Sequence, residues 1–427
     1  MAAAKKPTTD ADWEHLSFML GTVFKPSTPV TARQLFAGRQ QQIMKVCDAI
    51  NQSGRHAILY GERGVGKTSC SNMIFPKLES TGYSLLIPQV NCMTGDTFGS
   101  IWKRVFEEIK IKVDDAPDTT LLPENARKTV EAYTEPYGDS ITPDVVRRLL
   151  HDLAKAFLVV VVLDEFDKIS DPATRQAIAD LIKFLSDRNV AATIILIGVA
   201  DDIEKLLEDH RSVERCMSQI QIPRMSRDEL ESVVIKGLRQ YQMTIEKGPL
   251  HEVSRISRGL PHYAHLLGLH AGRSAVERKS LVVSAVDMET AMNAAISDVE
   301  ASTISDYVKA TTSARDDALY KQVLLATSML EPDELGYFYP KDVRPCVSRI
   351  RGKECPITTF IKHLNAFCEI KRGAILTKDT KTESSRFRFS NPLLQPYVLM
   401  RGLTDRIITD DDLKETRDKN DPQMRLF

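Results

Sequence analysis

Residues 61–70, GERGVGKTSC, contain Gly61, four further residues and then Gly66-Lys67-Thr68. This spacing is the pattern of a phosphate-binding loop. In such a loop, backbone N–H groups freed by glycine converge on phosphate oxygens at a helix N-terminus. The lysine reaches the β- and γ-phosphates and the hydroxyl residue holds Mg²⁺. The nucleotide-binding residues predicted from the pattern are Gly61, Glu62, Arg63, Gly64, Val65, Gly66, Lys67, Thr68 and Ser69. The loop alone fits a kinase, a GTPase, a motor or a switch.

A second motif supplies acids about 100 residues further on. The apolar run in FLVVVVLDEFDKIS, residues 157–170, suits a strand covered on both faces of a parallel sheet. At its end, Asp164 can complete the Mg²⁺ shell together with Thr68. Glu165 can orient and activate a water, which favours a hydrolysing ATPase over a kinase or most GTPases. Asp167 is expected at the surface.

Alternating strands and helices must position these groups. HAILY leads into the loop, YSLLIPQVNC is a second strand, and ATIILIGVADD is another buried one. Asp171-Pro172 opens a helix with apolar residues at helical spacing. We therefore expect a doubly wound α/β domain with a parallel sheet.

The pattern changes near residue 223. Ser226 and Glu229 form a capping box, and helical periodicity continues to about residue 312 with no convincing strand. Helix-like stretches then precede two short strand-like runs, GAIL and RFRF, as in a winged helix. The predicted division is an arm over 1–30, a nucleotide-binding core over 31–222, a helical lid over 223–312, a winged helix over 315–403 and a charged, disordered tail over 404–427.

Bulk composition excludes several classes. The chain has 427 residues, enough for two to three domains, and a net charge of −1, so any nucleic-acid contact must come from a local basic patch. The seven cysteines contain no CxxC pair, which argues against a disulfide framework or a zinc site. The sequence contains neither a signal peptide nor a membrane span, which indicates the cytoplasm.

The order of the segments resembles AAA+ ATPases. LFAGRQQQI, LYGERGVGKTS, VVVLDEFDKI, IILIGVADDIEKLL and RCMSQIQIPRM follow one another as in that family, and look most like its initiator clade of origin-recognition and transposition-regulator ATPases. The resemblance covers about residues 31–400. It implies ATP and Mg²⁺ as ligands and ATP-dependent self-association.

The resemblance also implies roles for single residues. Asp201 falls at the sensor-1 position, where the family often has Asn; it either contacts water through a bridge or caps the next helix. Arg215 lies where the family has an arginine finger, with Arg211 as the alternative. His262 stands where a sensor-2 arginine is usual, so hydrolysis is expected to be slow. Arg258 is the candidate substitute, although its spacing differs from the family's by one helical turn.

Two further features of the sequence can each be interpreted in two ways. Gly38-Arg39 resembles the segment that packs near adenine, and a structural salt bridge for Arg39 is equally open. Between Lys341 and Ser390 there are twelve Lys or Arg and five Asp or Glu, about +7. This excess favours DNA contact through the winged helix. The alternative is a signal-transduction or scaffold ATPase whose winged helix binds protein. A small-molecule kinase is disfavoured by Asp164-Glu165 and by the large lid.

The chain ends in DPQMRLF. Gln423, Leu426 and Phe427 resemble the QxxLF peptide by which bacterial proteins dock into a sliding clamp. The alternative is a tail that folds back or has no role.

Overall fold

In the computed structural model, placements are described for residues 7–29, 36–79, 84–114, 141–199, 211–314, 318–380, 385–409 and 411–413. The chain forms two compact units. We call Pro29–Gly61 with Gly66–Ile222 the sheet unit, and Met1–Thr28, Glu62–Val65 and Pro223–Phe427 the helical unit.

The sheet unit alternates strands with helices. Its elements are α2 Gln40–Ile50, β1 His56–Tyr60, α3 Lys67–Asn72, α4 Phe75–Glu79, β2 Leu85–Leu86, β3 Gln89–Asn91, α5 Phe98–Asp114, α7 Pro143–Leu153, β4 Leu158–Asp164, the 3₁₀ turn η3 Phe166–Lys168, α8 Pro172–Asp187, β5 Ala192–Gly198, α10 Arg211–Glu214 and β6 Met217–Gln221.

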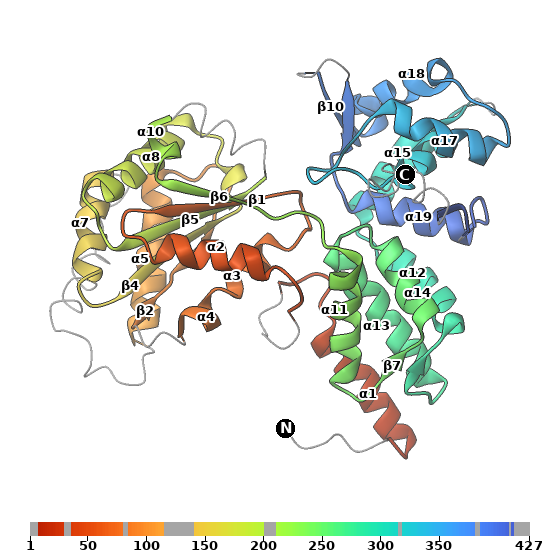
Figure 1. Cartoon of the computed structure of the whole chain (residues 1–427), viewed down its shortest axis with the longest axis horizontal. Helices are drawn as coiled ribbons and strands as arrows, with labels where there is room; N and C mark the ends of the chain where they lie inside the picture. Colours follow the sequence, from red (N-terminus) through yellow and green to blue (C-terminus); the bar gives the residue numbers. More distant parts are fainter. Residues whose placement is uncertain are drawn as a thin grey trace, which may run out of the picture. The chain divides into compact units, whose positions relative to one another are not determined.

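All strand pairs in this sheet are parallel, in the order β2-β4-β5-β1-β6, and β3 also pairs with β4 (Figure 1). Strand β5 therefore separates β1, which leads into the phosphate loop, from β4, which carries the acids. Residues 85–91, expected as one strand, form two short ones on either side of Ile87-Pro88, because proline cannot donate a ladder hydrogen bond.

Both faces of the sheet are covered. Alternate residues of β4 and β5, such as Val161 and Ile194, join a core with α5, α7 and α8 around the buried Trp102. The intervening residues, such as Val160 and Ile195, are equally buried and point to the opposite face because side chains alternate along a strand. The continuous apolar run in β4 is thus explained by burial on two sides, as the sequence predicted.

The helical unit begins with a departure from expectation. Within the segment expected to be an arm, residues Asp10–Val23 form helix α1, with a capping box at Thr9 and with Leu16, Leu20 and Val23 buried. Helix α1 packs against α11 and α13 (Figure 1). Apolar residues at helical spacing, hidden among Thr, Pro and Lys, explain the difference.

Helices follow residue 223, in the region where the sequence predicts a lid. They are α11 Arg227–Arg239, α12 Lys247–Ile256, α13 Pro261–Glu277 and α14 Ala285–Ser297. The capping box of Ser226 and Glu229 is present at the start of α11. The expectation of no strand was wrong in detail, because Thr244–Ile245 (β7) and Val282–Val283 (β8) pair in parallel.

The C-terminal region, as we name residues 301–413, combines helices with a small antiparallel sheet. Its elements are α15 Ala301–Thr311, α16 Tyr320–Ser328, β9 Tyr337–Phe338, α17 Pro340–Arg351, α18 Ile357–Phe367, the 3₁₀ turn η4 Ile370–Arg372, β10 Leu376–Asp379, β11 Arg386–Phe389 and α19 Leu394–Thr404. The predicted hairpin is β10–β11. Its first strand lies later than GAIL, and β9 adds a third strand that the sequence did not reveal.

The start of the expected tail is ordered. Ile408 and Leu413 are buried in the core of the C-terminal region. Arg349 also donates to the Asp412 backbone carbonyl at 2.7 Å. The expectation of a disordered tail from residue 404 was therefore wrong as far as residue 413, because two apolar residues among the charges suffice to anchor the segment.

Candidate nucleotide site

The glycine-rich loop has the backbone that its sequence predicts. Strand β1 ends at Tyr60, and α3 begins at Lys67 with Gly66 as N-cap. Gly64 and Gly66 have φ angles of 83° and 90°, a left-handed conformation that residues with a Cβ rarely adopt. Lys67 Nζ donates to the Gly61 carbonyl at 3.1 Å, which holds the ammonium group against the loop.

The two nucleotide motifs meet at Thr68. Its hydroxyl donates to Asp164 Oδ2 at 2.6 Å, although the residues are 96 positions apart. Burial raises the pKa of Asp164, and the hydrogen bonds from the Thr68 hydroxyl and the Glu165 backbone N–H oppose that rise. A hydroxyl and a carboxylate on adjacent elements are oxygen ligands of the kind that Mg²⁺ prefers.

Protein groups here would hold only part of a metal shell. Across the described ranges, no three His, Cys, Asp or Glu side chains form a group that could hold a metal ion. This fits a Mg²⁺ ion that takes one or two protein oxygens and completes its shell with phosphate and water. Thr68 and Asp164 therefore fit a Mg–nucleotide complex.

Glu165 adopts a conformation of its own. Its φ of 54° lies in the left-handed region, which is sparsely populated for residues other than glycine and is common at functional sites. Its carboxylate forms an ion pair with Lys168 Nζ at 2.6 Å. The Glu165 side chain is 43% exposed and the Lys168 side chain 38%. A pair this exposed is worth about 0–1 kcal/mol, so Glu165 can leave Lys168 at little cost.

Other groups around Asp164 were not predicted. Asn91 lies opposite Asp164 in the β3–β4 register, and Arg104 donates to the Asn91 carbonyl at 2.7 Å. Arg104 also forms an ion pair with Asp96, in the turn after β3. Asp96 and Arg104 are eight residues apart and belong to no recognisable motif, so the sequence did not predict their ion pair.

Asp167 is not the solvated surface residue that was expected. Its Oδ1 accepts a hydrogen bond from the Val199 backbone N–H at 3.3 Å, at the end of β5. It thus ties the turn after β4 to the strand that leads toward the predicted sensor 1. Asp201 itself lies outside the described residues.

Two predicted arginines can be located. Arg215 is exposed directly after α10, a position from which it can reach another molecule. Arg39 is the N-cap of α2, with φ 63°, and is only 4% exposed. Its charge lowers the pKa of the Cys70 thiol on α3, whereas burial, the larger effect, raises that pKa to about 12.

The loop residues Glu62–Val65 belong to the helical unit. There Glu62 is buried and receives two hydrogen bonds from Arg224, Nε to Oε2 at 2.5 Å and Nη2 to Oε1 at 3.0 Å. Gly336, with φ 87°, contacts Glu62 so closely that a Cβ there would overlap its carboxylate. Of the remaining loop residues, Val65 is buried, Arg63 is exposed, and Ser69 is intermediate. The pairing of Glu62 was missed because its partner is 162 residues away.

His262, at the predicted sensor-2 position, is a hydrogen-bonded histidine. His262 Nδ1 lies 2.8 Å from the Pro26 carbonyl, which can only accept, so this nitrogen carries the proton. Burial lowers the pKa of His262 below its ordinary value, against the smaller effect of that hydrogen bond. The imidazole is thus neutral at pH 7. Arg258, considered as a substitute, instead lines a pocket with Glu331.

Comparison with known proteins gives the class. Residues 35–195 match the AAA ATPase domain. The chain therefore contains an AAA ATPase domain and is an ATPase, with a P-loop in an α/β fold built on a parallel sheet. The predicted P-loop, the α/β class and the parallel sheet are therefore confirmed. A search of curated protein sequences found no match. No helix in the described ranges is long and apolar enough to cross a membrane.

Solved structures share the architecture at low identity. A Walker-type ATPase of Pyrococcus abyssi is 14% identical with a TM-score of 0.55, covering 88% of this chain and 99% of that one. The ORC2 protein of Aeropyrum pernix, solved with ADPNP and ADP, is 13% identical with a TM-score of 0.49, covering 92% and 98%. Cdc6p from Pyrobaculum aerophilum is 14% identical with a TM-score of 0.48, covering 92% and 98%.

Proposed function

We propose that the chain is an initiator-type switch ATPase that binds Mg–ATP, hydrolyses it slowly, assembles with itself and acts on DNA. The observation that carries the nucleotide part is the 2.6 Å contact of Thr68 with Asp164, which joins the phosphate loop to the acid strand. ATP supplies the γ-phosphate and Mg²⁺ neutralises its charge when both are bound.

The chain's own residues divide the work. Backbone N–H groups of the loop and Lys67 hold the phosphates, Thr68 and Asp164 hold the metal, and Glu165 orients the attacking water. Slow turnover follows from two features: Glu165 is engaged with Lys168, and a neutral His262 replaces an arginine.

Point variants test these roles. Lys67→Ala should abolish ATP binding, because it removes the charge that faces the phosphates. Glu165→Gln should keep ATP binding and lose turnover, because the loop stays intact. Normal turnover by Glu165→Gln would show that the base has been assigned to the wrong residue.

The DNA part of the proposal rests on the C-terminal region, which we interpret as a winged helix. One face of its sheet packs Phe338, Phe387 and Phe389 into the core. On the other face, Arg386 and Arg388 lie over the Tyr337 ring, at 3.9 and 4.9 Å from its centroid. Arginines held on an aromatic ring beside a local charge of about +7 can follow a phosphate backbone.

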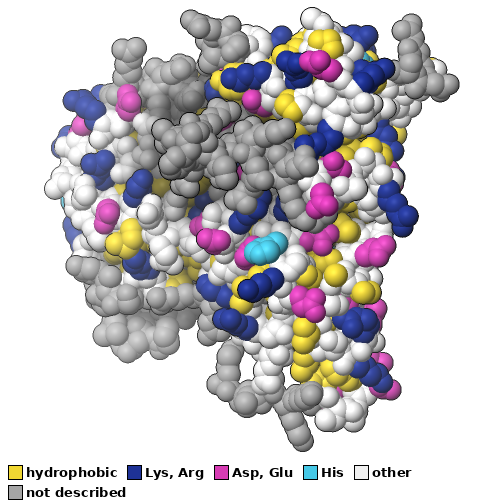
Figure 2. Space-filling model, turned by 45° about the vertical axis from the view of Figure 1, so that its right-hand side comes forward, with side chains coloured by type: hydrophobic (Ala, Val, Ile, Leu, Met, Phe, Trp, Pro, Cys, Tyr) yellow, Lys and Arg dark blue, Asp and Glu magenta, His cyan; other side chains and the backbone are white. Residues whose placement is uncertain are grey.

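The alternative is a scaffold ATPase that binds protein through the same region. One observation favours it: several of the basic residues are paired internally, including Arg386 with Asp379 at 2.9 Å and Lys371 with Glu369 at 2.5 Å. Figure 2 likewise shows basic and acidic side chains intermixed on the face turned forward.

A salt titration of DNA binding separates the two. The double variant Lys378→Gln, Arg388→Gln removes two positive charges. Their side chains hydrogen-bond to neutral partners, Lys378 to Asn365 and Arg388 to Thr377. If DNA is bound, the slope of log K against log salt should fall by about 2. The control is Arg148→Gln on α7 combined with Lys155→Gln in the turn that follows it, where the side chains are 62% and 65% exposed and no effect is expected. Absence of DNA binding at low salt favours the scaffold.

Self-association is proposed to complete the site. In that arrangement the exposed Arg215 supplies transition-state charge to the neighbouring subunit. Mixing Arg215→Ala with Lys67→Ala protein should restore activity, because some interfaces pair an intact loop with an intact arginine. Good co-assembly without recovered activity would exclude a role in trans.

The clamp-binding tail remains a separate proposal, since Gln423, Leu426 and Phe427 lie outside the described residues. A 412–427 peptide should bind a bacterial sliding clamp with micromolar affinity. The same peptide with Leu426→Ala and Phe427→Ala should not bind. Equal binding by both peptides, or none by either, would refute the idea.

A further inference from the structure

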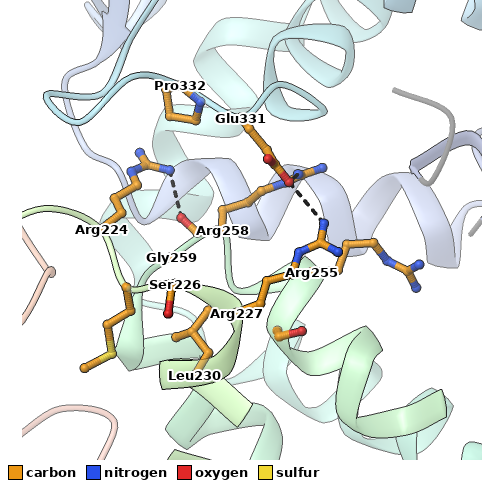
Figure 3. A pocket seen from close by; sticks show the side chains of 11 residues that line it. Arg224, Ser226, Arg227, Leu230, Arg255, Arg258, Gly259, Glu331 and Pro332 are labelled. Carbon is orange, nitrogen blue, oxygen red and sulfur yellow. Dashed lines mark hydrogen bonds and ion pairs between the residues drawn. The ribbon is translucent and has the colours of Figure 1, made fainter. Parts of the chain in front are cut away.

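A pocket of about 300 Å³ lies within the helical unit, at the start of α11 and the end of α12. Its lining includes four arginines and one acid, and Figure 3 shows them gathered between Pro332 and Leu230. These charged residues are Arg224, Arg227, Arg255, Arg258 and Glu331. None of the lining residues belongs to the phosphate loop, so the pocket's positive charge needs a separate explanation.

Arg258 is the lining residue whose buried donors need a partner. Its side chain is only 4% exposed, and among the described residues its Nε and Nη2 atoms have no hydrogen-bond partner. An ion pair joins its Nη1 to Glu331 Oε1 at 3.8 Å, which is too long for a hydrogen bond. A buried polar group without a partner is costly, and a buried charge more so.

Arg258 also keeps its charge. Burial lowers its pKa from 12.5 to about 10, so the guanidinium stays protonated at neutral pH. Arg258 sits at a φ of 47°, in the left-handed region, directly before Gly259. The backbone of Arg258 is fixed by Arg224, whose Nη1 donates to the Arg258 carbonyl at 2.9 Å. The donor that faces the pocket is thus charged and anchored at its backbone.

Glu331 occupies the pocket only in part. It is half exposed and contacts Arg227 Nη2 at 3.1 Å, in addition to the long contact with Arg258. One carboxylate therefore stands against two arginines, Arg227 and Arg258. A second anion, or one that replaces Glu331, would satisfy the donors left over.

We propose that this pocket binds a compact phosphate group, held by Arg258 and Arg227 in competition with the carboxylate of Glu331. The planar guanidinium matches phosphate oxygens with two parallel hydrogen bonds, which suits the unpartnered Nε and Nη2 of Arg258. The volume admits inorganic phosphate or a diphosphate group. The ligand class is therefore a small phosphate or diphosphate, recognised independently of the nucleotide loop.

The test is calorimetric titration of the full chain with inorganic phosphate and, separately, with pyrophosphate, at constant ionic strength. The titration is repeated in Lys67→Ala protein, so that the nucleotide loop cannot supply the signal. Saturable binding at one site is expected to remain in Lys67→Ala protein, and the variants below are made in that background. The tighter of the two anions identifies whether the pocket suits one phosphate or two.

Opposite effects are expected from two variants. Arg227→Gln should weaken binding at least tenfold by removing a donor, and Glu331→Gln should tighten it severalfold by removing the competing charge. Arg239→Gln, exposed on the same helix, is the control and should change nothing. Arg258→Met should abolish binding, with circular dichroism to confirm folding; if it does not fold, the Arg227 and Glu331 variants decide.

The proposal is overturned by any of three results: no saturable binding, binding that disappears in Lys67→Ala, or Glu331→Gln protein that binds no more tightly than its Lys67→Ala parent. The second result would locate the phosphate at the nucleotide loop and leave the ATPase function intact.

Discussion

Substitution of Gly237 by Ala should destabilise the helical unit, although the same change in most helix interiors stabilises. Gly237 lies inside α11, where Ala is ordinarily better than Gly by about 1 kcal/mol. Here a Cβ would fall 2.5 Å from the Phe24 ring, which is itself 1% exposed and also closely approaches Gly268 of α13. The Phe24 ring, which directly follows α1, therefore packs against Gly237 and Gly268.

The magnitude follows from two opposing effects. A Cβ only 2.5 Å from a buried ring places the overpacking cost in the upper part of its usual range, at about 2–3 kcal/mol, and the propensity gain offsets about 1 kcal/mol of this. We expect a net loss of about 1–2 kcal/mol, or a fall in Tm of roughly 2–8 °C for a unit of this size. The assay is thermal unfolding followed by circular dichroism, with Arg239→Ala as control. Arg239 is exposed on the same helix, so that variant should change the Tm little.

A double variant isolates the contact. Phe24→Leu removes ring atoms, so Gly237→Ala should cost less in that background than alone, with a coupling energy of about 1 kcal/mol or more. If Gly237→Ala raises the Tm, or if its cost is the same with Leu at position 24, then Phe24 does not occupy the surface of α11 and the docking of α1 is wrong.

Three further outcomes follow from the sheet unit. The buried His56 accepts from the Ile194 N–H at 2.9 Å, and burial lowers its pKa to about 3, so below pH 6.5 only the unfolded chain takes up the proton. The free energy of unfolding should therefore fall by up to about 1.4 kcal/mol per pH unit on acidification. The variant His56→Asn keeps a hydrogen-bond acceptor and should show a shallower fall in Tm between pH 7 and 5. Equal slopes of Tm against pH in the two proteins would argue against titration of His56. Lys168→Met should leave ATP binding unchanged and raise kcat by up to about fivefold, because it frees Glu165 from a pair worth at most about 1 kcal/mol; a lower kcat would assign Lys168 a positive role. Asp164→Asn should abolish the effect of Mg²⁺ on ATP affinity, measured by titration with and without the metal, and a retained Mg²⁺ effect would remove Asp164 from the metal shell.

The elements that carry the nucleotide motifs could be predicted because local sequence determines them. The apolar run before Asp164 has only one stable placement, a strand buried on both faces, and the glycines at 64 and 66 permit the turn that follows β1. Helix α8 begins after Asp171 and buries the expected stripe, because capping and period are both short-range signals.

The remaining features depend on partners far away in the chain. Glu62 looks like any loop residue until Arg224 is placed beside it, and Arg258 looks like a surface charge until the helical unit closes around it. Helix α1 was missed because its apolar residues stand in a segment rich in Thr, Pro and Lys, and because the α11 and α13 glycines that contact Phe24 and Leu20 are more than 200 residues away. Such contacts have no spacing rule, so only the folded structure reveals them.

The central proposal is that the chain is a switch ATPase that acts on DNA, so ATP bound at the loop is expected to change its DNA affinity. It is tested most directly by measuring, by fluorescence anisotropy, the affinity of the chain for a short duplex with Mg–ATP, with Mg–ADP and without nucleotide, in wild-type and Lys67→Ala protein. The account predicts that Mg–ATP tightens binding by wild type and has no effect on Lys67→Ala. DNA affinity that ignores nucleotide in the wild type, or that responds equally in Lys67→Ala, would contradict it.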